Sequence, residues 1–115
     1  MCIFCKIVSG EIPADKIYED ESLLAFLDIA PVNPGHVLVI PKKHYENIEE
    51  TPEEVLCWLI KKVKEVGLAV KNGLGVSGYN IVQNNGSVAG QVVPHLHFHI
   101  IPRKENDNLH LWQVS

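Results

Sequence analysis

The sequence predicts an α+β fold in which an antiparallel sheet packs against one long helix. Three observations predict it. The stretch VPHLHFHIIP at 93–102 alternates histidine with large apolar residues, which is the period of a strand. Residues 51–70 carry apolar side chains at helical spacing. Short turns join the remaining strand-like segments to this helix, an arrangement typical of antiparallel α+β domains.

Four further segments have strand character. They are KIYED (16–20), LLAFLDI (23–29), HVLVIPK (36–42), which is expected to be central, and SGYNIVQ (77–83) after the helix. In the last strand, the three histidines share one face, and Leu96, Phe98 and Ile100 share the other. Pro94 and Pro102 bracket this run, since proline is tolerated only at strand ends and edges. The apolar face must then cover a core, and the histidine face must look into water or into a site.

The helix is expected to begin at TPEEV, with Thr51 as N-cap, Pro52 at the first helical position and Glu54 completing a capping box. Its stretch VLCWLI (55–60) is apolar without a break, whereas a helix that covers one core needs only a stripe. The extra apolar face, which includes Trp58, is expected to contact a second copy of the chain in a homodimer. The alternative is deep burial within one subunit.

Length and composition restrict the class of protein. The 115 residues suit a single domain, 1–115. A net charge of −4 argues against a nucleic-acid partner, and no apolar run approaches the length of a membrane span. The first ten residues lack the features of a signal peptide. Three cysteines, an odd number, indicate a reducing cytoplasm rather than a disulfide framework.

Three explanations compete for His95, His97 and His99. Packing in a core is expensive, because each ring needs partners for two nitrogens. A single metal held by all three is strained, since the outer pair lie about 13 Å apart along a strand and zinc holds nitrogen at about 2 Å. Phosphorus chemistry suits them better: a neutral imidazole is a good nucleophile at pH 7, and its neighbours can bind phosphate oxygens. The upstream loop NNGSVAGQ adds Gly86 and Gly90, which allow close backbone approach.

At these residues the chain resembles a known family. GQVVPHLHFHIIPR is similar to the signature of the histidine triad (HIT) superfamily, and residues 3–44 are similar to the N-terminal half of its Hint branch. The resemblance extends from Cys2 to about Arg103. It implies a HIT-like sheet extended across a homodimer. It also implies a nucleotide-binding hydrolase or nucleotidyl transferase that acts at the α-phosphate of nucleoside phosphoramidates or related monophosphate esters. The implied substrate is a purine nucleotide of adenosine type.

Two other activities remain open within this resemblance. One is hydrolysis of dinucleoside polyphosphates, which needs room for a second nucleoside. The other is a nucleotide-binding regulatory or scaffold protein whose hydrolysis is incidental. Neither alternative nor the main hypothesis requires a catalytic metal, because a histidine attacks phosphorus directly.

The resemblance assigns roles to individual residues. His97 is the nucleophile that forms a nucleotidyl–imidazole intermediate, with its second ring nitrogen held by the backbone carbonyl of His95. His99 contacts the phosphate oxygens, His36 is a fourth site histidine, and Asp28 binds the ribose hydroxyls. The base pocket is lined by Phe4, Ile7, Phe26, Ile29 and Leu38, each of which could equally be a core residue. The loop that holds the phosphate and leaving group contributes Asn84, Gly90, Gln91, Val92 and Val93.

Two features depart from the family pattern. Many relatives carry Ser or Thr where this chain has Val92, so a hydroxyl that could bond the leaving atom is missing. The tail 104–115 matches no family pattern, and in the family the tail influences substrate choice. Trp112 in this tail either closes over the pocket or serves as a buried anchor.

Cys2 and Cys5 form a CxxC motif. A thioredoxin-type motif needs a helix running from it, which KIVSGEIP is not expected to supply. Two thiolates at this spacing suit zinc, which needs two more ligands, and a metal-free pair is the alternative. Prokaryotic HIT proteins with this motif, which the chain resembles, imply a structural zinc completed by His44 and His95. Cys57 is expected to be a small core residue of the helix.

Overall fold

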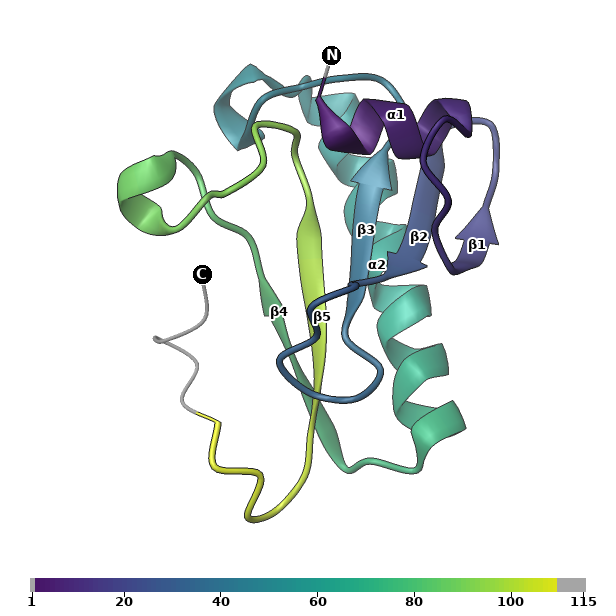
Figure 1. The fold of residues 1–115 in the computed structure, drawn as a ribbon, viewed down its shortest axis with the longest axis vertical. Coiled ribbons are helices and arrows are strands. Elements are labelled where there is room, and N and C mark those ends of the chain that lie inside the picture. The colour runs from purple at the N-terminus through teal and green to yellow at the C-terminus, as the bar shows by residue number, and fades with distance from the viewer. Residues whose placement is uncertain (1, 110–115) are drawn as a thin grey trace.

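A computed structural model describes residues 2–109. Its elements, in chain order, are α1 (Ile3–Ser9), β1 (Lys16–Glu19), β2 (Leu23–Leu27), β3 (Val37–Pro41), the 3₁₀ turn η1 (Ile48–Glu50), α2 (Glu53–Leu74), β4 (Gly78–Val82), η2 (Ser87–Ala89) and β5 (Phe98–Arg103). The strands form one antiparallel sheet in the order β1-β2-β3-β5-β4 (Figure 1). The predicted α+β class and antiparallel sheet with one long helix are confirmed.

The sheet has a core on each face. Helix α2 covers one face, and its buried cluster comprises Leu23, Ala25, Val37, Val39, Leu59, Val63, Val66, Leu96, Phe98 and Ile100. The short helix α1 covers part of the other face, where the buried cluster comprises Phe4, Ile7, Leu24, Phe26, Leu38 and Ile40. In Figure 1, α2 runs behind the sheet and α1 crosses one end of it. The alternation in the last strand therefore sends its apolar residues to α2 and its histidines toward α1.

The histidine strand is shorter than predicted at its start. β5 begins at Phe98, so His95 and His97 lie in an irregular extended segment ahead of it. Pro102 lies inside β5 opposite Tyr79, and does not end the strand as expected. This position is tolerated because the pairing with β3 has already stopped at Ile100. The prediction of which residues share a face is nevertheless confirmed by the two buried clusters.

The predicted capping box at the start of α2 is wrong. The N-cap is Pro52, which makes no side-chain capping bond, and the helix begins at Glu53. The Thr51 hydroxyl donates instead to the carbonyl of Asn47 at 2.7 Å, and the Thr51 amide closes η1. Thr51 is occupied in ending the 3₁₀ turn, so its side chain is not available to the helix that follows.

The apolar run at 55–60 is used largely by its own chain. Val55 and Leu59 are buried, and Trp58 packs against the same core. Cys57 is exposed, so the expectation that it is a small core residue is wrong. Ile60 is 47% exposed. No helix among residues 2–109 is long and apolar enough to cross a membrane.

The CxxC motif does lie on a helix, contrary to the prediction. α1 begins after Cys2, whose sulfur accepts from the Cys5 amide at 3.2 Å, and ends at Gly10 with φ 85°. The helix has only seven residues, too few for apolar periodicity to indicate it. It is held mainly by burial of Phe4 and Ile7 against the sheet, as expected for a helix too short to be stable alone.

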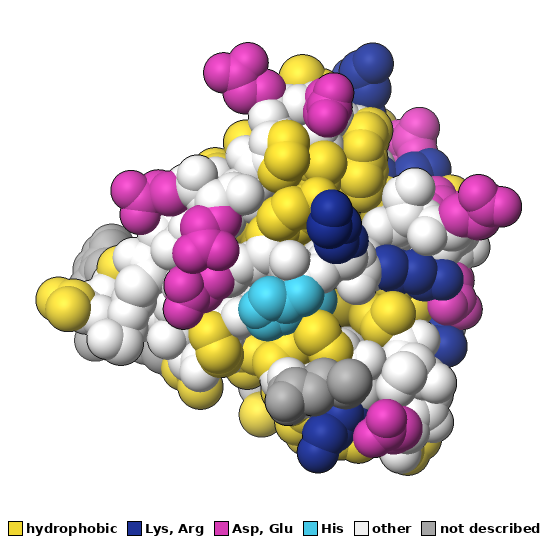
Figure 2. Space-filling model, turned by 90° about the horizontal axis from the view of Figure 1, so that it is seen from above, with side chains coloured by type: hydrophobic (Ala, Val, Ile, Leu, Met, Phe, Trp, Pro, Cys, Tyr) yellow, Lys and Arg dark blue, Asp and Glu magenta, His cyan; other side chains and the backbone are white. Residues whose placement is uncertain are grey.

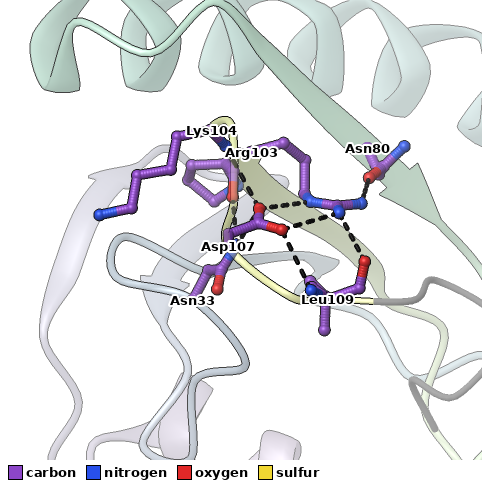
Figure 3. Close-up of polar contacts among 7 residues, drawn as sticks. Asn33, Asn80, Arg103, Lys104, Asp107 and Leu109 are labelled. Carbon is purple, nitrogen blue, oxygen red and sulfur yellow. Dashed lines mark hydrogen bonds and ion pairs between the residues drawn. The ribbon is translucent and has the colours of Figure 1, made fainter.

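Beyond β5 the chain turns back toward the sheet. The Arg103 guanidinium pairs with the Asp107 carboxylate and also bonds Asn80 on β4 (Figure 3). The start of the predicted variable tail is thus an ordered turn tied to two strands. Trp112 lies outside the described residues.

Candidate active site

A cavity of about 300 Å³ lies between α1, the loop that follows β2, and the histidine segment. It is lined by Ile3, Phe4, Asp28, Ile29, Ala30, Val32, His36, Leu38, Val92, Val93, His97 and His99. The structure thus brings most of the predicted site residues to one cavity. Ile3, Ala30 and Val32 were not predicted; Ile3 could have been inferred only by recognising α1.

Six of the predicted catalytic and nucleotide-binding residues do not line this cavity. His95 is buried, and its Nδ1 faces Cys2 and Cys5 instead. Ile7 and Phe26 are buried in the layer behind Phe4 and Leu38. Asn84, Gly90 and Gln91 lie in the loop between β4 and the histidine segment. The lining itself is predominantly apolar, with three histidines and one carboxylate converging on it, which is the usual composition of a small-molecule site.

His97 is held in one tautomer. Its Nδ1–H donates to the backbone carbonyl of His95 at 2.6 Å, which leaves Nε2 as the nitrogen that carries the lone pair. The edge contact with the Phe4 ring, at 5.1 Å between centroids, fixes the ring plane. Burial lowers the pKa of His97 below its ordinary value. The ring is therefore a neutral, oriented nucleophile at pH 7.

His36 and His99 are joined by hydrogen bonds whose direction can be deduced. The Val32 amide donates to Nδ1 of His36 at 3.3 Å, so the proton of His36 is on Nε2. That Nε2–H donates to Nδ1 of His99 at 2.9 Å, so His99 carries its own proton on Nε2. Asp28 lies 3.6 Å from Nε2 of His36. We call Asp28, His36 and His99 the histidine relay.

The relay ends in an N–H donor. Within the described residues, Nε2 of His99 is buried and has no hydrogen-bond partner. Burial, followed by the neighbouring rings of His97 and His36, lowers the pKa of His99 to about 4. The ring is therefore neutral at pH 7. A buried donor without a partner is costly, and it marks a place where a ligand acceptor can bind.

Asn84 supplies a second such donor. Its Nδ2 is also buried without a partner among residues 2–109. Asn84 follows β4 by two residues, after the last paired position, Val82 opposite His99. Gln91 has a different function here: its amide binds the carbonyl of Glu46 at 2.6 Å and the amide of Gly86 at 2.8 Å, and so fixes the loop.

Four atoms of metal-ligating type come together where Nδ1 of His95 faces the two cysteines. Each Sγ of Cys2 and Cys5 lies 3.3–3.6 Å from Nδ1 of His44 and Nδ1 of His95, and the two sulfurs are 3.2 Å apart. In tetrahedral zinc sites, bond lengths near 2.0–2.3 Å give ligand separations of roughly 3.5–3.8 Å. We call these four residues the thiol–histidine cluster.

The protonation of His95 also fits a metal. Its Nε2–H donates to the carbonyl of Pro41 at 2.8 Å, which turns the lone pair of Nδ1 toward the sulfurs. His44 is exposed, so the cluster is open to solvent on one side. Seen from the end of the molecule that α1 crosses, histidine side chains reach the surface among apolar and basic side chains (Figure 2). The residues present therefore suit zinc, whose predicted ligands come together from three segments of the chain.

A cavity that holds an oriented, neutral imidazole beside a buried N–H donor without a partner among the described residues is suited to phosphorus chemistry. The comparison with known families agrees: the chain belongs to the HIT domain family, whose pattern matches residues 9–106.

Relatives from archaea and eukaryotes are similar to most of this chain. An uncharacterized HIT-like protein of Methanocaldococcus jannaschii is 64% identical, covering 93% of this chain and 82% of that protein. Adenylylsulfatase HINT3 of Arabidopsis thaliana is 48% identical, covering 94% and 55%. Adenosine 5'-monophosphoramidase hnt1 of Schizosaccharomyces pombe is 48% identical, covering 92% and 77%. A crystal structure described as a Zn-bound histidine triad family protein from Mycobacterium smegmatis matches with a TM-score of 0.90 and 44% identity, covering 95% and 79%.

Proposed function

We propose that this chain is a nucleotide hydrolase or nucleotidyl transferase that cleaves nucleoside phosphoramidates or related monophosphate esters through His97. One observation carries the proposal: the fixed, neutral imidazole of His97 lines the cavity beside His99, whose buried Nε2–H has no hydrogen-bond partner among residues 2–109. The similarity to an adenosine monophosphoramidase and an adenylylsulfatase supports a nucleotide with an adenosine moiety.

In the first chemical step, Nε2 of His97 forms a bond to the α-phosphorus as the bond from phosphorus to the leaving amine breaks. The Nδ1–H of His97 remains on the carbonyl of His95 and stabilises the cationic ring that results. Nε2–H of His99 is expected to bind the non-bridging oxygens, where charge develops, and the Asn84 amide is a second candidate for this role. Water then breaks the bond between phosphorus and His97, which releases the nucleoside monophosphate and restores the ring.

The nucleoside is expected to occupy the apolar part of the cavity. Phe4, Ile29 and Leu38 offer surfaces for a base. Asp28 lies on the cavity wall, where it can accept hydrogen bonds from ribose hydroxyls while its other oxygen binds the Ala30 amide at 3.0 Å. The combination of apolar side chains, a carboxylate and histidines in one cavity supports a purine nucleoside monophosphate as the recognised unit.

The test is a panel of substrates measured under one set of assay conditions. Adenosine and guanosine phosphoramidates, diadenosine polyphosphate and adenylyl sulfate are compared by kcat/KM. We expect the adenosine phosphoramidate to be among the fastest. Tight binding of adenosine monophosphate without turnover of any substrate would instead favour a regulatory or scaffold protein, and preferential cleavage of the polyphosphate would favour the second enzyme class.

We also propose one structural zinc per chain in the thiol–histidine cluster, and a cytoplasmic location that would keep both thiols reduced. The support is the convergence of four ligand atoms and the Zn-bound relative. When bound, the ion would supply a rigid link between α1 and the segments of His44 and His95. It takes no part in the step at phosphorus.

Finally, we propose that two copies associate through α2 and the outer edge of β4. Ile81 on that strand is 44% exposed, and an apolar hollow beside it is lined by Ile48, Leu56, Cys57, Ile60 and Phe98. Pairing of two β4 strands would extend the sheet across the dimer. Sedimentation analysis of the wild type and Ile81→Lys tests this, since a lysine there should shift the mass toward a monomer.

A further inference from the structure

The carboxylate of Asp107 is an unusually well-bonded group for its place in a C-terminal turn. It accepts from Nε of Arg103 at 2.8 Å, from Nη2 at 3.1 Å, and from the amides of Lys104 and Leu109 at 3.2 and 3.1 Å. Its side chain is only 6% exposed. The Arg103 hydrogen bond is the main cause that lowers the pKa of Asp107, so the group stays charged.

A fifth bond leaves this turn and reaches another part of the chain. Nδ2 of Asn33 donates to Oδ2 of Asp107 at 3.1 Å and to the carbonyl of Pro102 at 2.9 Å. Figure 3 shows the Asn33 side chain beside the Asp107 carboxylate, across from Arg103. Asn33 is thus bound to both the end of β5 and the turn that follows it.

Asn33 begins the turn that delivers His36. Its carbonyl accepts from the His36 amide at 3.2 Å, with Pro34 and Gly35 between them. Gly35 has φ 84°, and this order of Pro and left-handed Gly is typical of a type II turn. The residue before Asn33 is Val32, whose amide sets the tautomer of His36.

The same loop forms one wall of the cavity, through Asp28, Ile29, Ala30 and Val32. Within residues 2–109, the hydrogen bonds that tie residues 29–35 to chain outside 28–36 are the two made by the Asn33 amide. These two bonds therefore fix the part of the wall that lies beyond the closing backbone bond from the Asp28 amide to the His36 carbonyl.

We propose that Asn33, Asp107 and Arg103 form a positioning network that fixes the wall of the nucleotide cavity and the orientation of His36. None of the three lines the cavity, so they act through the loop. The network makes the ordered start of the tail a determinant of nucleotide affinity. This inference rests on the proposed function only for the identity of the ligand.

The first test measures binding and turnover separately in Asp107→Asn and Asn33→Ala. We expect the Kd for adenosine monophosphate, measured by calorimetry, and the KM for the adenosine phosphoramidate to rise about five- to tenfold, the value of roughly one hydrogen bond. The fall in kcat should be smaller than the rise in Kd, because His97 and its carbonyl partner lie on another segment and only the histidine relay is disturbed through His36. If Kd and KM stay at wild-type values while stability falls, the network is merely structural and the proposal is wrong.

Asp20→Asn is the matched control. The Asp20 carboxylate likewise binds two backbone amides, of Ser22 and Leu23, and a side-chain donor, but in the turn before β2. Its loss should lower stability without changing Kd. In the double variant of Asn33→Ala and Asp107→Asn, Kd should equal that of the single variant that binds adenosine monophosphate more weakly. A Kd raised by the product of the two single effects would show that the two residues act separately.

Hydrogen exchange gives a readout that needs no nucleotide. Protection of the Val32 and His36 amides should fall in Asp107→Asn and stay unchanged in Asp20→Asn. Should the wild type bind no adenosine monophosphate, the proposed function fails, yet this measurement still decides on the network. Unchanged protection of these amides in both Asp107→Asn and Asn33→Ala would overturn the proposed network. If Asp107→Asn does not fold, the measurement on Asn33→Ala decides by itself.

Discussion

The thiol–histidine cluster and the histidine relay look alike when only distances are considered. Each brings ligand-type atoms within 4.8 Å of one another: Cys2, Cys5, His44 and His95 in the first, and Asp28, His36 and His99 in the second. Both include a member of the histidine triad. Proximity alone would therefore suggest a metal site on each side of His97.

The protons distinguish the two. In the cluster, the proton of His95 is turned outward to a carbonyl, so a lone pair faces the two sulfurs. In the relay, the Val32 amide occupies one nitrogen of His36 and a proton occupies the space between His36 and His99. A cation there would have to displace that proton. One group is thus arranged to hold a metal, and the other to aim an N–H donor.

His97 depends on both groups. The cluster holds His95, whose carbonyl takes the Nδ1–H of His97. The relay places the Nε2–H of His99 beside it, with the two rings 4.9 Å apart. The segment of His95 and His97 lies ahead of β5, so side-chain bonds add to the backbone bond from the Leu96 amide to the Tyr45 carbonyl in fixing it.

The largest expected effect comes from removing the residue that the two groups serve. His97→Ala should lower kcat by more than about 10³-fold, since a nucleophile is lost. It should leave the Kd for adenosine monophosphate within a few-fold, because other residues form the cavity walls. Steady-state kinetics and calorimetry measure the two quantities.

Mass spectrometry of wild-type protein quenched during turnover supplies the complementary evidence. A nucleotide mass should appear on the peptide that contains His97, and fragmentation should place it on that ring. An adduct on His95 would contradict the protonation deduced for the thiol–histidine cluster. An adduct on His99 would contradict the protonation deduced for the histidine relay.

Breaking the thiol–histidine cluster should have the next largest effect. Cys5→Ser should lower zinc affinity by about 10²-fold or more and reduce the melting temperature. It should also lower kcat by about tenfold, because the carbonyl of His95 loses its fixed position. Elemental analysis, thermal unfolding and kinetics are the measurements.

Cys57→Ser is the control for that variant, since it makes the same chemical change at an exposed cysteine outside the cluster. It should retain about one zinc per chain and full activity. Metal-free wild-type protein of unchanged stability would remove the zinc proposal. Zinc that persists at full stoichiometry in Cys5→Ser would place the metal elsewhere, with the relay as the first candidate.

The faces of the sheet could be predicted from the sequence because alternation in a strand has a fixed geometric consequence. Leu96, Phe98 and Ile100 lie against α2 as expected. The start of α2 could not be predicted, because the hydroxyl and the amide of Thr51 make hydrogen bonds within a 3₁₀ turn. The sequence pattern of that turn is too short to recognise. α1 was missed for the same reason: its stability comes from contacts with strands far along the chain.

The candidate site shows the same limit. The four ligands of the cluster were assigned from a resemblance, and no local pattern places His44 beside Cys2. The direction of the hydrogen bonds in the relay depends on the Val32 amide, a backbone group that the sequence does not single out. The role of Asn33 depends on Asp107, which lies 74 positions further along the chain. Such long-range pairings follow from the fold.

The relay can be tested through the pH dependence of stability. The pKa of His99 is about 4 in the folded chain, below its ordinary value of 6.5, so the unfolded chain binds more protons between these values. Stability is therefore present above pH 6.5 and is lost as the pH falls toward 4. With metal chelated in both proteins, wild type should lose roughly 3 kcal/mol more than His99→Gln over this window.

Asp28, His36 and His97 face His99, so a parallel measurement on His36→Gln separates their contributions. The pKa of His36 is also lowered, chiefly by burial. His36→Gln should therefore also reduce the loss of stability between pH 6.5 and 4. Equal slopes for wild type and His99→Gln would show that His99 is not kept neutral by its surroundings, and the deduced direction of the relay would lose its support.

The smallest predicted effect concerns a donor that neither group supplies. Val92 lines the cavity and is 76% exposed, at the place where many relatives carry Ser or Thr. A phosphoramidate releases an amine that must gain a proton as its bond to phosphorus breaks. Valine has nearly the shape of threonine but no hydrogen-bonding atom. Val92→Thr should therefore raise kcat/KM for the phosphoramidate about tenfold, the value of one good hydrogen bond in the transition state.

A substrate that releases a stable anion separates this effect from a general change in the cavity. Adenosine monophosphate esterified to nitrophenol needs no proton on its leaving group, so Val92→Thr should change its kcat/KM by less than about twofold. Val92→Ala is the matched variant, because it alters the volume without adding a donor. If both substrates respond equally, or neither responds, position 92 does not contact the leaving atom. The proton would then have to come from His99, Gln91 or water. If it comes from His99, the histidine relay acts on the leaving group as well as on the phosphate.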